Sequence, residues 1–296
     1  MKIMQKIKIK EYERSIIKFW EQYKESKLGL LGLFILLFFI LVSAFAGILA
    51  PYPVGSIQGD INAILKPPTS KYLMGTDELG RDLLSLIIYG GKVSLTIGFL
   101  ATLVTAIIGT LVGVSAGYFG GTTEELLMRF TDIFLVIPGL PLMIVLASIL
   151  GATFWNMILV IGIQGWTGTA RVLRAQVLSL KEKPFIESAR AIGASDTRII
   201  IRHIIPNVLP LIVAQMVLRV GSSILSAASL SFLGLGDPTH ISWGMTLHYA
   251  FSVGSLFSGF YWYIIPPGIC ITLVVLSFAF IGYALDQVVN PRIRKR

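Results

Sequence analysis

Few residues in this chain have the type and spacing that enzymatic chemistry requires. The nearest match to a phosphate-binding loop is Gly91-Lys92, but Leu86 stands where the loop needs its first glycine and Val93 where it needs a serine or threonine. The three histidines are scattered, and no metal site is expected. The single cysteine, Cys270, excludes an internal disulfide and is typical of a small buried hydrophobe. We therefore expect no catalytic residue, cofactor or metal in this chain.

One charged side chain, Arg219, stands inside an apolar stretch. Together with Gln215, Ser222, Ser223 and Ser226 it forms a polar stripe at helical spacing. An arginine at the centre of a membrane helix costs about 2.5–3.5 kcal/mol on insertion scales, so it should face protein or water. We expect the stripe to line a translocation path. The alternatives are an arginine that binds carbonyl groups of a neighbouring helix, or one nearer the membrane interface.

The composition explains why an apolar stretch surrounds this arginine. Of the 296 residues, 54% are hydrophobic and 14% are charged, whereas a soluble domain carries about 25% charge. The mean hydropathy is +0.77. The net charge of +9 comes from 25 Lys and Arg against 16 Asp and Glu. Nucleic-acid binding would account for basic charge but not for this apolarity, so we expect an integral protein of the lipid bilayer and no nucleic-acid partner.

Six stretches are apolar enough to cross a bilayer as helices, since about 20 apolar residues span its core. The fold class expected is therefore all-α, with spans at 28–50, 93–117, 133–152, 153–170, 208–236 and 261–285. The first is about twice as long as the core of a signal peptide and should be a retained helix. None of the six contains Asp or Glu, which argues against an ion-coupled carrier, and no converging groups suggest a membrane enzyme.

The distribution of basic residues predicts the orientation of these helices. Twenty Lys and Arg fall on the side that carries both termini, and four fall on the other side. We expect a multi-pass protein of a prokaryotic plasma membrane. Its cytoplasmic parts would be 1–27, 118–132, 171–207 and 286–296, and its extracytoplasmic parts 51–92 and 237–260.

Two local patterns bear on how the helices pack. Gly109, Gly113 and Gly117 form a small-residue stripe, against which another helix should press closely. Pro138-Gly139-Leu140-Pro141 must interrupt the hydrogen bonding of the third span, because proline lacks the N–H. Such a break either borders a cavity or is a plain packing feature, and the sequence leaves both open.

The loop 171–207 predicts a docking surface. Pro184 begins a short helical stretch that reaches a turn at Gly193. A second helical stretch, capped by Ser195 or Asp196, continues to Pro206. Two short helices on the cytoplasmic side would present themselves to another protein.

The same loop resembles the EAA loop of ABC-importer permeases, through Glu187-Ser188-Ala189, Gly193 and Ile205-Pro206. Ser188 replaces an alanine of the family and His203 an isoleucine, yet residues 202–207 are close to the form of the peptide and nickel branch. Further matching motifs are Gly75–Asp82, Gly117–Gly121 with Met128, Arg129 and Asp132, and Leu230–Gly236 with Pro238 and Ser242-Trp243-Gly244. Over nearly the whole chain the sequence resembles the second permease subunit of dipeptide and oligopeptide importers.

This resemblance implies a type I ABC importer permease fold, with the permease domain at 93–285. It also implies that the ATPase-coupling residues are Glu187, Ser188, Ala189, Gly193, Ala194, Ser195 and Pro206, with Pro206 ending the coupling segment before the fifth helix. The partners implied are a homologous permease, two cytoplasmic ATPase subunits that carry ATP and magnesium, and an extracytoplasmic substrate-binding protein.

The substrate class implied is di- or oligopeptides, with nickel or oligosaccharides as the alternative cargo for the same machinery. The chain departs from its relatives at Ser226-Ala227-Ala228, where they often carry an acidic residue. That departure leaves the substrate open, but not the class of transporter.

Overall fold

The computed structural model describes residues 20–52 and 59–289, and this part of the chain is helical without a named strand. The expected cytoplasmic ends lie partly outside these residues, at 1–19 and 290–296. The α-helices are α2 (Lys27–Ala44), α3 (Ala46–Leu49), α4 (Leu83–Phe119), α5 (Gly121–Val136), α6 (Gly139–Leu150), α7 (Phe154–Lys181), α8 (Pro184–Ala191), α9 (Asp196–Ile199), α10 (Ile205–Leu230), α11 (Trp243–Ser252) and α12 (Tyr261–Val289). A 3₁₀ turn, η2, covers Ile61–Ala63, and π-helical turns, η3 and η4, cover Ile200–Ile204 and Ser231–Leu235.

Within the described residues, four helical segments are each long and apolar enough to cross a membrane. They are α2, α4, the continuous helix Asp196–Leu235, and α12 over Tyr261–Gln287. A fifth candidate is the pair α5 and α6, which meet at an angle of 91°. The expected fourth span, 153–170, coincides with the first part of α7. Because Asn156, Gln164 and Arg171 make α7 more polar, it is not among the apolar candidates.

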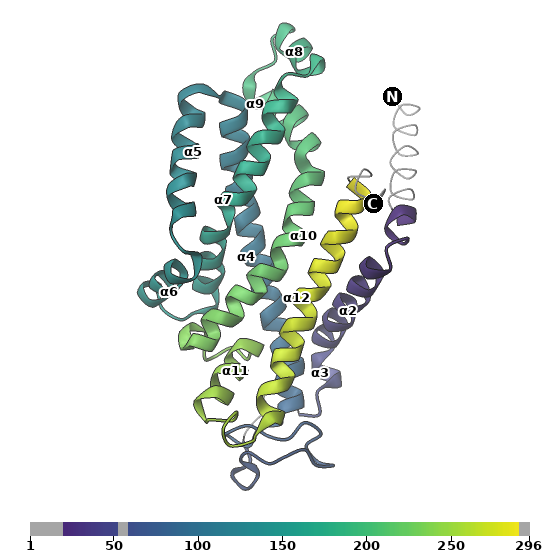
Figure 1. Cartoon of the computed structure of the whole chain (residues 1–296), viewed down its shortest axis with the longest axis vertical. Helices are drawn as coiled ribbons and strands as arrows, with labels where there is room; N and C mark the ends of the chain where they lie inside the picture. The colour runs from purple at the N-terminus through teal and green to yellow at the C-terminus, as the bar shows by residue number, and fades with distance from the viewer. Residues whose placement is uncertain (1–19, 53–58, 290–296) are drawn as a thin grey trace.

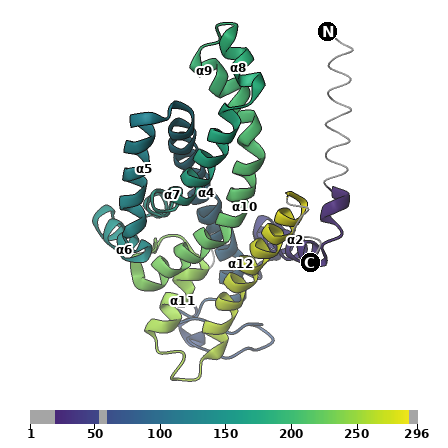
Figure 2. The same cartoon turned by 45° about the horizontal axis from the view of Figure 1, so that its top comes forward.

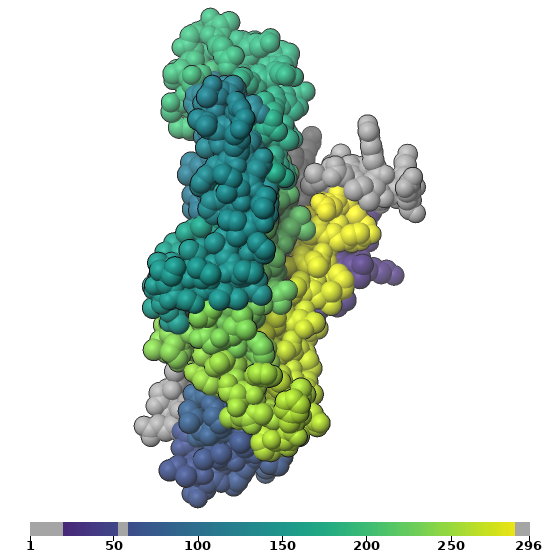
Figure 3. Space-filling view, turned by 60° about the vertical axis from the view of Figure 1, so that its left-hand side comes forward, coloured from purple at the N-terminus to yellow at the C-terminus, as the bar shows by residue number. Residues whose placement is uncertain are grey.

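Helix α4 is the central element, packed against α2, α7, α10 and α11 (Figure 1). It runs parallel to α7, whereas α2 and α12 pair antiparallel, with Gly29 of α2 beside Ala284 of α12. Figure 2 shows α8 and α9 projecting beyond the bundle at one end, with α11 near the other. The space-filling view in Figure 3 shows α5 and α6 covering one flank between these ends.

Two helices begin earlier than expected from the sequence. Helix α4 starts at Leu83, so residues 83–92 are helical rather than part of an extracytoplasmic loop. Asp82 caps this start by accepting a hydrogen bond from the Ser85 backbone N–H at 2.8 Å. Leu83 and Leu86 are buried, so this extension packs within the protein instead of facing lipid. Helix α5 starts at Gly121, twelve residues before the expected span begins.

The expected third span, 133–152, is interrupted at the prolines, as the sequence predicted. The chain breaks at Ile137 and Pro138, and two separate helices, α5 and α6, replace it. Pro138 has no N–H, and Pro141 stands in the first turn of α6, where an N–H would have no intrahelical partner anyway. The two prolines therefore stop one helix and start the next.

The earlier start of α5 brings charged residues that were expected in a loop into a helix of the bundle. Helix α5 carries Glu124, Glu125, Arg129 and Asp132. Arg174 of α7 pairs with Glu124, Arg171 of α7 lies 2.6 Å from Asp132, and Arg129 lies 2.5 Å from Glu125. The charges are thus paired, within α5 or across to α7.

The loop expected at 171–207 is mostly helical, and Pro206 does not end its second segment. Helix α7 continues to Lys181, and α9 runs through the π turn Ile200–Ile204 into α10 without a break. Pro206 stands in the first turn of α10, directly after the π turn. A proline at this position costs little hydrogen bonding. The segment from Asp196 to Pro206 is therefore continuous with the helix that carries Arg219.

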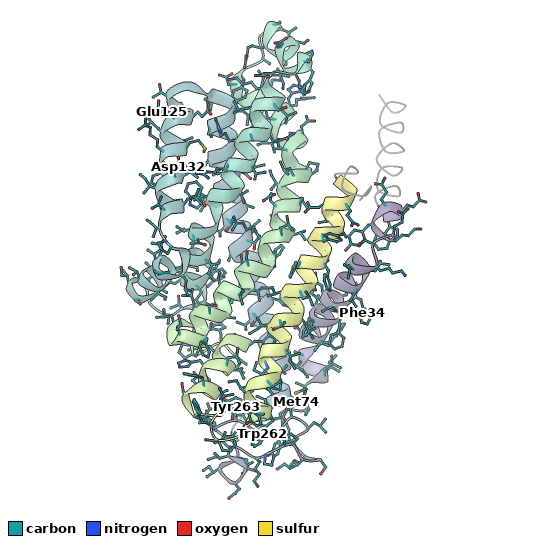
Figure 4. All side chains as sticks on the ribbon, viewed as in Figure 1. Phe34, Met74, Glu125, Asp132, Trp262 and Tyr263 are labelled. Atoms are coloured by element: carbon teal, nitrogen blue, oxygen red, sulfur yellow. The ribbon has the colours of Figure 1, made fainter. Side chains whose placement is uncertain are left out.

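The segment 59–82 forms a compact cap at the end of the bundle opposite α8. The Asp77 carboxylate is fully buried and lies 2.5 Å from the Arg81 Nε. Its Oδ1 accepts the backbone N–H groups of Leu79 and Arg81 at 3.0 and 2.7 Å. The Tyr263 hydroxyl of α12 donates to Glu78, and Figure 4 shows Tyr263 beside Trp262 at this end. Through these contacts, residues of the motif Gly75–Asp82 hold the cap together and attach it to α12.

Candidate functional site

The turn between α8 and α9 has the geometry of a glycine-terminated helix. The Ala194 N–H donates to the Ala189 carbonyl at 3.1 Å, and the Gly193 N–H donates to the Arg190 carbonyl at 3.0 Å. Gly193 has φ +81, the left-handed conformation that this motif requires. The Ser195 hydroxyl then caps α9 by accepting from the Arg198 N–H at 3.4 Å. Both short helices and the turn lie where the loop sequence predicted them.

The seven residues expected to couple to an ATPase do not share one exposed face. Glu187, Ser188, Gly193, Ser195 and Pro206 are exposed, and Ala194 is half-buried. Ala189, by contrast, is buried against the protein. It packs with Ile186 and Ile199, which fix α8 and α9 onto the ends of α4 and α7.

An exposed apolar residue at the tip was missed in the sequence. Ile192, just before Gly193, is 86% exposed, and Phe185 on the same short helix is also exposed. Large apolar side chains at a solvent-facing tip are typical of a contact surface. The sequence signal was an isoleucine directly before a helix-ending glycine in an otherwise polar stretch.

Tyr118, near the end of α4, connects the central helix to the tip. Its hydroxyl donates to the Asp196 carboxylate of α9 at 2.6 Å. The Nζ of Lys181 and the Cζ of Arg190 lie 5.9 and 6.0 Å from the centre of its ring, within the range of cation–π attraction. The hydrogen bond with Tyr118 raises the pKa of Arg190. Movement of α9 is thereby tied to α4.

The glycine stripe of α4 lies directly against α7. A Cβ added to Gly113 would stand 2.5 Å from the Ala170 carbonyl oxygen, and one added to Gly117 would stand 2.8 Å from the Arg174 carbonyl oxygen. At Gly109 the nearest atom is the Thr169 Cβ, at 2.8 Å. No side chain fits at these positions without moving α7.

The polar stripe of α10 lies on an incompletely covered face. Ser222 is exposed, and Gln215, Arg219 and Ser226 are half-buried. Ser223 does not belong to the stripe, because it is buried and accepts a hydrogen bond from the Thr102 hydroxyl of α4 at 3.0 Å. The stripe therefore keeps four of the five residues that the spacing suggested.

Between α5 and α7 lies a charged cavity of about 620 Å³. It is lined by Gly121, Glu124, Glu125, Met128, Arg129, Asp132, Arg171 and Arg174. Glu125 and Asp132 lie along one helix, as Figure 4 shows. Glu124 and Asp132 pair with arginines of α7 and so fasten α5 to α7, whereas Glu125 pairs with Arg129 within α5. The cavity therefore presents no unpaired carboxylate.

At the opposite end, Asp237 holds the start of α7. Its carboxylate accepts the Phe154 N–H at 2.9 Å and the Thr239 N–H at 2.8 Å, and His240 Nδ1 lies 2.9 Å away. Burial alone would raise the pKa of Asp237, but the hydrogen bonds from Thr239, Phe154 and His240 together hold it below its usual value.

Residues singled out as non-functional have structural roles. Gly91, in the rejected phosphate-loop match, packs within α4 against Ser43 and Trp243. Trp243 is buried and donates its Nε1–H to the Ile87 carbonyl at 2.8 Å. Cys270 is buried in α12. No group of three or more His, Cys, Asp and Glu that could hold a metal occurs among residues 20–52 and 59–289.

Comparison with known families gives two matches that together cover most of the chain. Residues 109–295 match the family described as the binding-protein-dependent transport system inner membrane component. Residues 17–68 match the N-terminal transmembrane domain of oligopeptide transport permease C.

Individual relatives align over almost the full length. The chain is 33% identical to the dipeptide transport system permease protein DppC of Bacillus subtilis, over 93% of this chain and 85% of that protein. It is 37% identical to DppC of Alkalihalophilus pseudofirmus, covering 93% and 89%. Against the glutathione transport system permease protein GsiD of Escherichia coli O157:H7 the identity is 36%, covering 94% and 90%.

A solved structure shares the fold. An inward-facing structure of the MetNI methionine ABC transporter contains a chain that matches with a TM-score of 0.54 and 20% sequence identity, over 71% of this chain and 97% of that one. The resemblance in sequence, the two family matches and this fold agree. The chain belongs to the binding-protein-dependent transport system inner membrane components, the permease family of ABC importers.

Proposed function

We propose that this chain is one of two permease subunits that form the translocation path of an ATP-driven importer for di- or oligopeptides. The identity of 33–37% to permeases named for dipeptide and glutathione transport supports this substrate class. Glutathione is itself a tripeptide, so both kinds of relative carry short peptides. No feature among residues 20–52 and 59–289 favours nickel or an oligosaccharide.

The projecting tip α8–α9 is the site proposed to dock a cytoplasmic ATPase subunit. Glu187, Ser188 and Gly193 are exposed there, next to the apolar Ile192. The tip is held by buried contacts to α4 and α7 and continues into α10, so a force on it would move three membrane helices together. Hydrolysis of ATP with magnesium would occur in two such ATPase subunits and not in this chain.

The orientation proposed follows the basic residues. The tip α8–α9, the start of α2 and the end of α12 lie toward one end in Figure 1, and this end would face the cytoplasm, with both termini. The cap 59–82 and α11 would face the extracytoplasmic binding protein. Under this orientation the paired charges of α5 lie in the cytoplasmic half of the bundle.

The test is transport by the whole complex in proteoliposomes. The chain would be purified with its partner permease, two ATPase subunits and the binding protein, and supplied with a labelled tripeptide, Ni²⁺ or a labelled trisaccharide. We expect ATP-dependent uptake of the tripeptide alone, and stimulation of ATP hydrolysis by the peptide-loaded binding protein. Uptake of Ni²⁺ or the sugar without the peptide would overturn the substrate class.

A further inference from the structure

The guanidinium of Arg219 has no hydrogen bond or ion pair among the described residues. The ion pairs found among residues 20–52 and 59–289 use other arginines, and none of them involves a side chain of α10. An unpaired charge within a membrane helix is costly, and such charges face a water-filled cavity or an anionic partner. Within the part of the chain that the structure describes, the side chain also binds no carbonyl of a neighbouring helix, which argues against the capping role considered for it.

The space around Arg219 is shaped by α7. A Cβ added to Gly168 would stand 2.4 Å from Arg219 Nη2, and no other residue lies within 4 Å of that position. The guanidinium therefore extends across to α7 in a place that only a glycine leaves open. Its other donors make no hydrogen bond with the described residues, and the residue is half-buried.

The depth of Arg219 decides which anion can reach it. It lies about 24 Å along the helix axis from Leu235 at 1.5 Å per residue, and farther still from the start of α9. Between Ile204 and Leu235 no other Asp, Glu, Lys or Arg occurs, so Arg219 stands at the middle of the uncharged part of the helix. We therefore place it within the hydrocarbon core, which is about 30 Å thick, and away from the lipid phosphates. An anion that pairs with Arg219 must enter the bundle.

A row of hydroxyl groups leads from Arg219 toward the outer end of α10. Ser222 and Ser229 donate to carbonyls of their own helix, at 2.8 and 2.9 Å, so their oxygen lone pairs remain free to accept. Ser229 lines an open groove of about 510 Å³, whose other walls include Leu225, Phe232 and Thr272. The groove is predominantly apolar, and its hydroxyls can accept N–H groups.

We propose that Arg219 binds the terminal carboxylate of a peptide in transit, while an apolar side chain of the same peptide occupies the groove at Ser229 and Phe232. This assignment rests on the proposed function. The planar guanidinium fork matches a carboxylate with two parallel hydrogen bonds. Arg219 and Ser229 are about 15 Å apart along α10, which an extended chain of about four residues spans.

The experiment compares one tetrapeptide with its C-terminal amide in proteoliposomes that hold the complete complex. Uptake of both forms would be measured with wild type and with Arg219→Gln. The effect of Arg219→Gln on uptake of the acid is divided by its effect on uptake of the amide. This ratio cancels any preference of the binding protein for one form, because that preference is the same in both complexes. We expect Arg219→Gln to lower uptake of the free acid about tenfold more than uptake of the amide, as loss of a charge-assisted pair implies.

Two further variants keep the test decisive. Arg219→Lys retains the charge without the fork, and should keep part of the preference for the acid. Gly168→Ala pushes the guanidinium from its place without removing it, and should lower the acid-to-amide ratio severalfold. Gly47→Ala, at a glycine with no neighbour within 4 Å, is the matched control and should leave the ratio unchanged.

Equal loss of acid and amide uptake in Arg219→Gln would overturn the assignment, because it would indicate a structural role or a pair with the second permease. No loss of either would also overturn it. If the Arg219 variants fail to assemble, an unchanged ratio in Gly168→Ala overturns it. A wild-type complex that imports neither form contradicts the proposed peptide transport itself.

Discussion

The Tyr118 hydroxyl donates a 2.6 Å hydrogen bond to the Asp196 carboxylate, and so joins the central helix α4 to the short helix α9. Tyr118 is buried, and Asp196 begins the helix that continues through the π turn into α10. The contact links the proposed docking tip with two helices of the bundle at once. Its effect on coupling can be measured directly.

Tyr118→Phe removes this hydrogen bond but keeps the ring between Lys181 and Arg190. A net contribution of about 1 kcal/mol corresponds to about fivefold, so we expect peptide uptake per ATP hydrolysed to fall about two- to fivefold. Uptake and phosphate release would be measured in the same proteoliposomes. Tyr283→Phe, at an exposed tyrosine of α12, is the control. If peptide uptake per ATP hydrolysed is the same in Tyr118→Phe and Tyr283→Phe, the contact has no role in coupling.

Gly193→Val forces a branched side chain into the left-handed conformation at φ +81. This costs about 1–2 kcal/mol and would open the turn between α8 and α9. We expect ATP hydrolysis to continue while peptide uptake is lost. Gly259→Val imposes the same strain at φ +79 at the other end of the molecule, and should leave the ratio of uptake to hydrolysis unchanged. Undiminished uptake in Gly193→Val would rule out a coupling role for this turn.

Glu187→Lys reverses the charge of an exposed side chain. The fold should keep its thermal stability, but co-purification of the ATPase subunit should decrease and transport should be uncoupled. Glu182→Lys, an exposed acid at the end of α7, is the matched control. If both variants bind the ATPase as wild type does, docking does not involve Glu187.

Gly113→Val places a side chain where a Cβ already stands 2.5 Å from the Ala170 carbonyl oxygen. Separating α4 from α7 costs about 1–3 kcal/mol, because overpacking displaces backbone. We expect the midpoint of thermal unfolding in detergent to fall by several degrees. Gly47→Ala should leave it unchanged. An unaltered midpoint in Gly113→Val would mean that α7 moves away without cost.

Acid should weaken the attachment of Asp237 to α7. The folded pKa lies below the usual 3.8, so the carboxylate stabilises the fold above that value, and this contribution is lost as the pH falls through the folded pKa. Thermal unfolding measured from pH 6 to pH 3 should therefore show a loss of stability that is smaller in Asp237→Asn. Identical pH profiles for the two proteins would contradict this assignment.

The sequence by itself determined the class of protein and much of its local structure. Long apolar runs admit only helices in a bilayer, because every backbone polar group must be satisfied internally. The short helices around Gly193 could also be predicted from the sequence, because a glycine in the left-handed conformation and a serine cap act over a few neighbouring residues. The glycine spacing of α4 indicated a close helix contact, because residues four apart share a face.

Tertiary structure decided what these local rules could not. The earlier starts of α4 and α5 depend on contacts with other helices, which bury Leu83 and pair two acids of α5. The α7 arginines that pair with Asp132 and Glu124 lie 39 and 50 residues away. The continuation past Pro206 depends on a π turn that shows no periodicity of its own. The place of the Arg219 side chain was likewise decided by Gly168, the glycine on α7 that faces it. These outcomes arise between segments distant in sequence, where burial and pairing outweigh local preference.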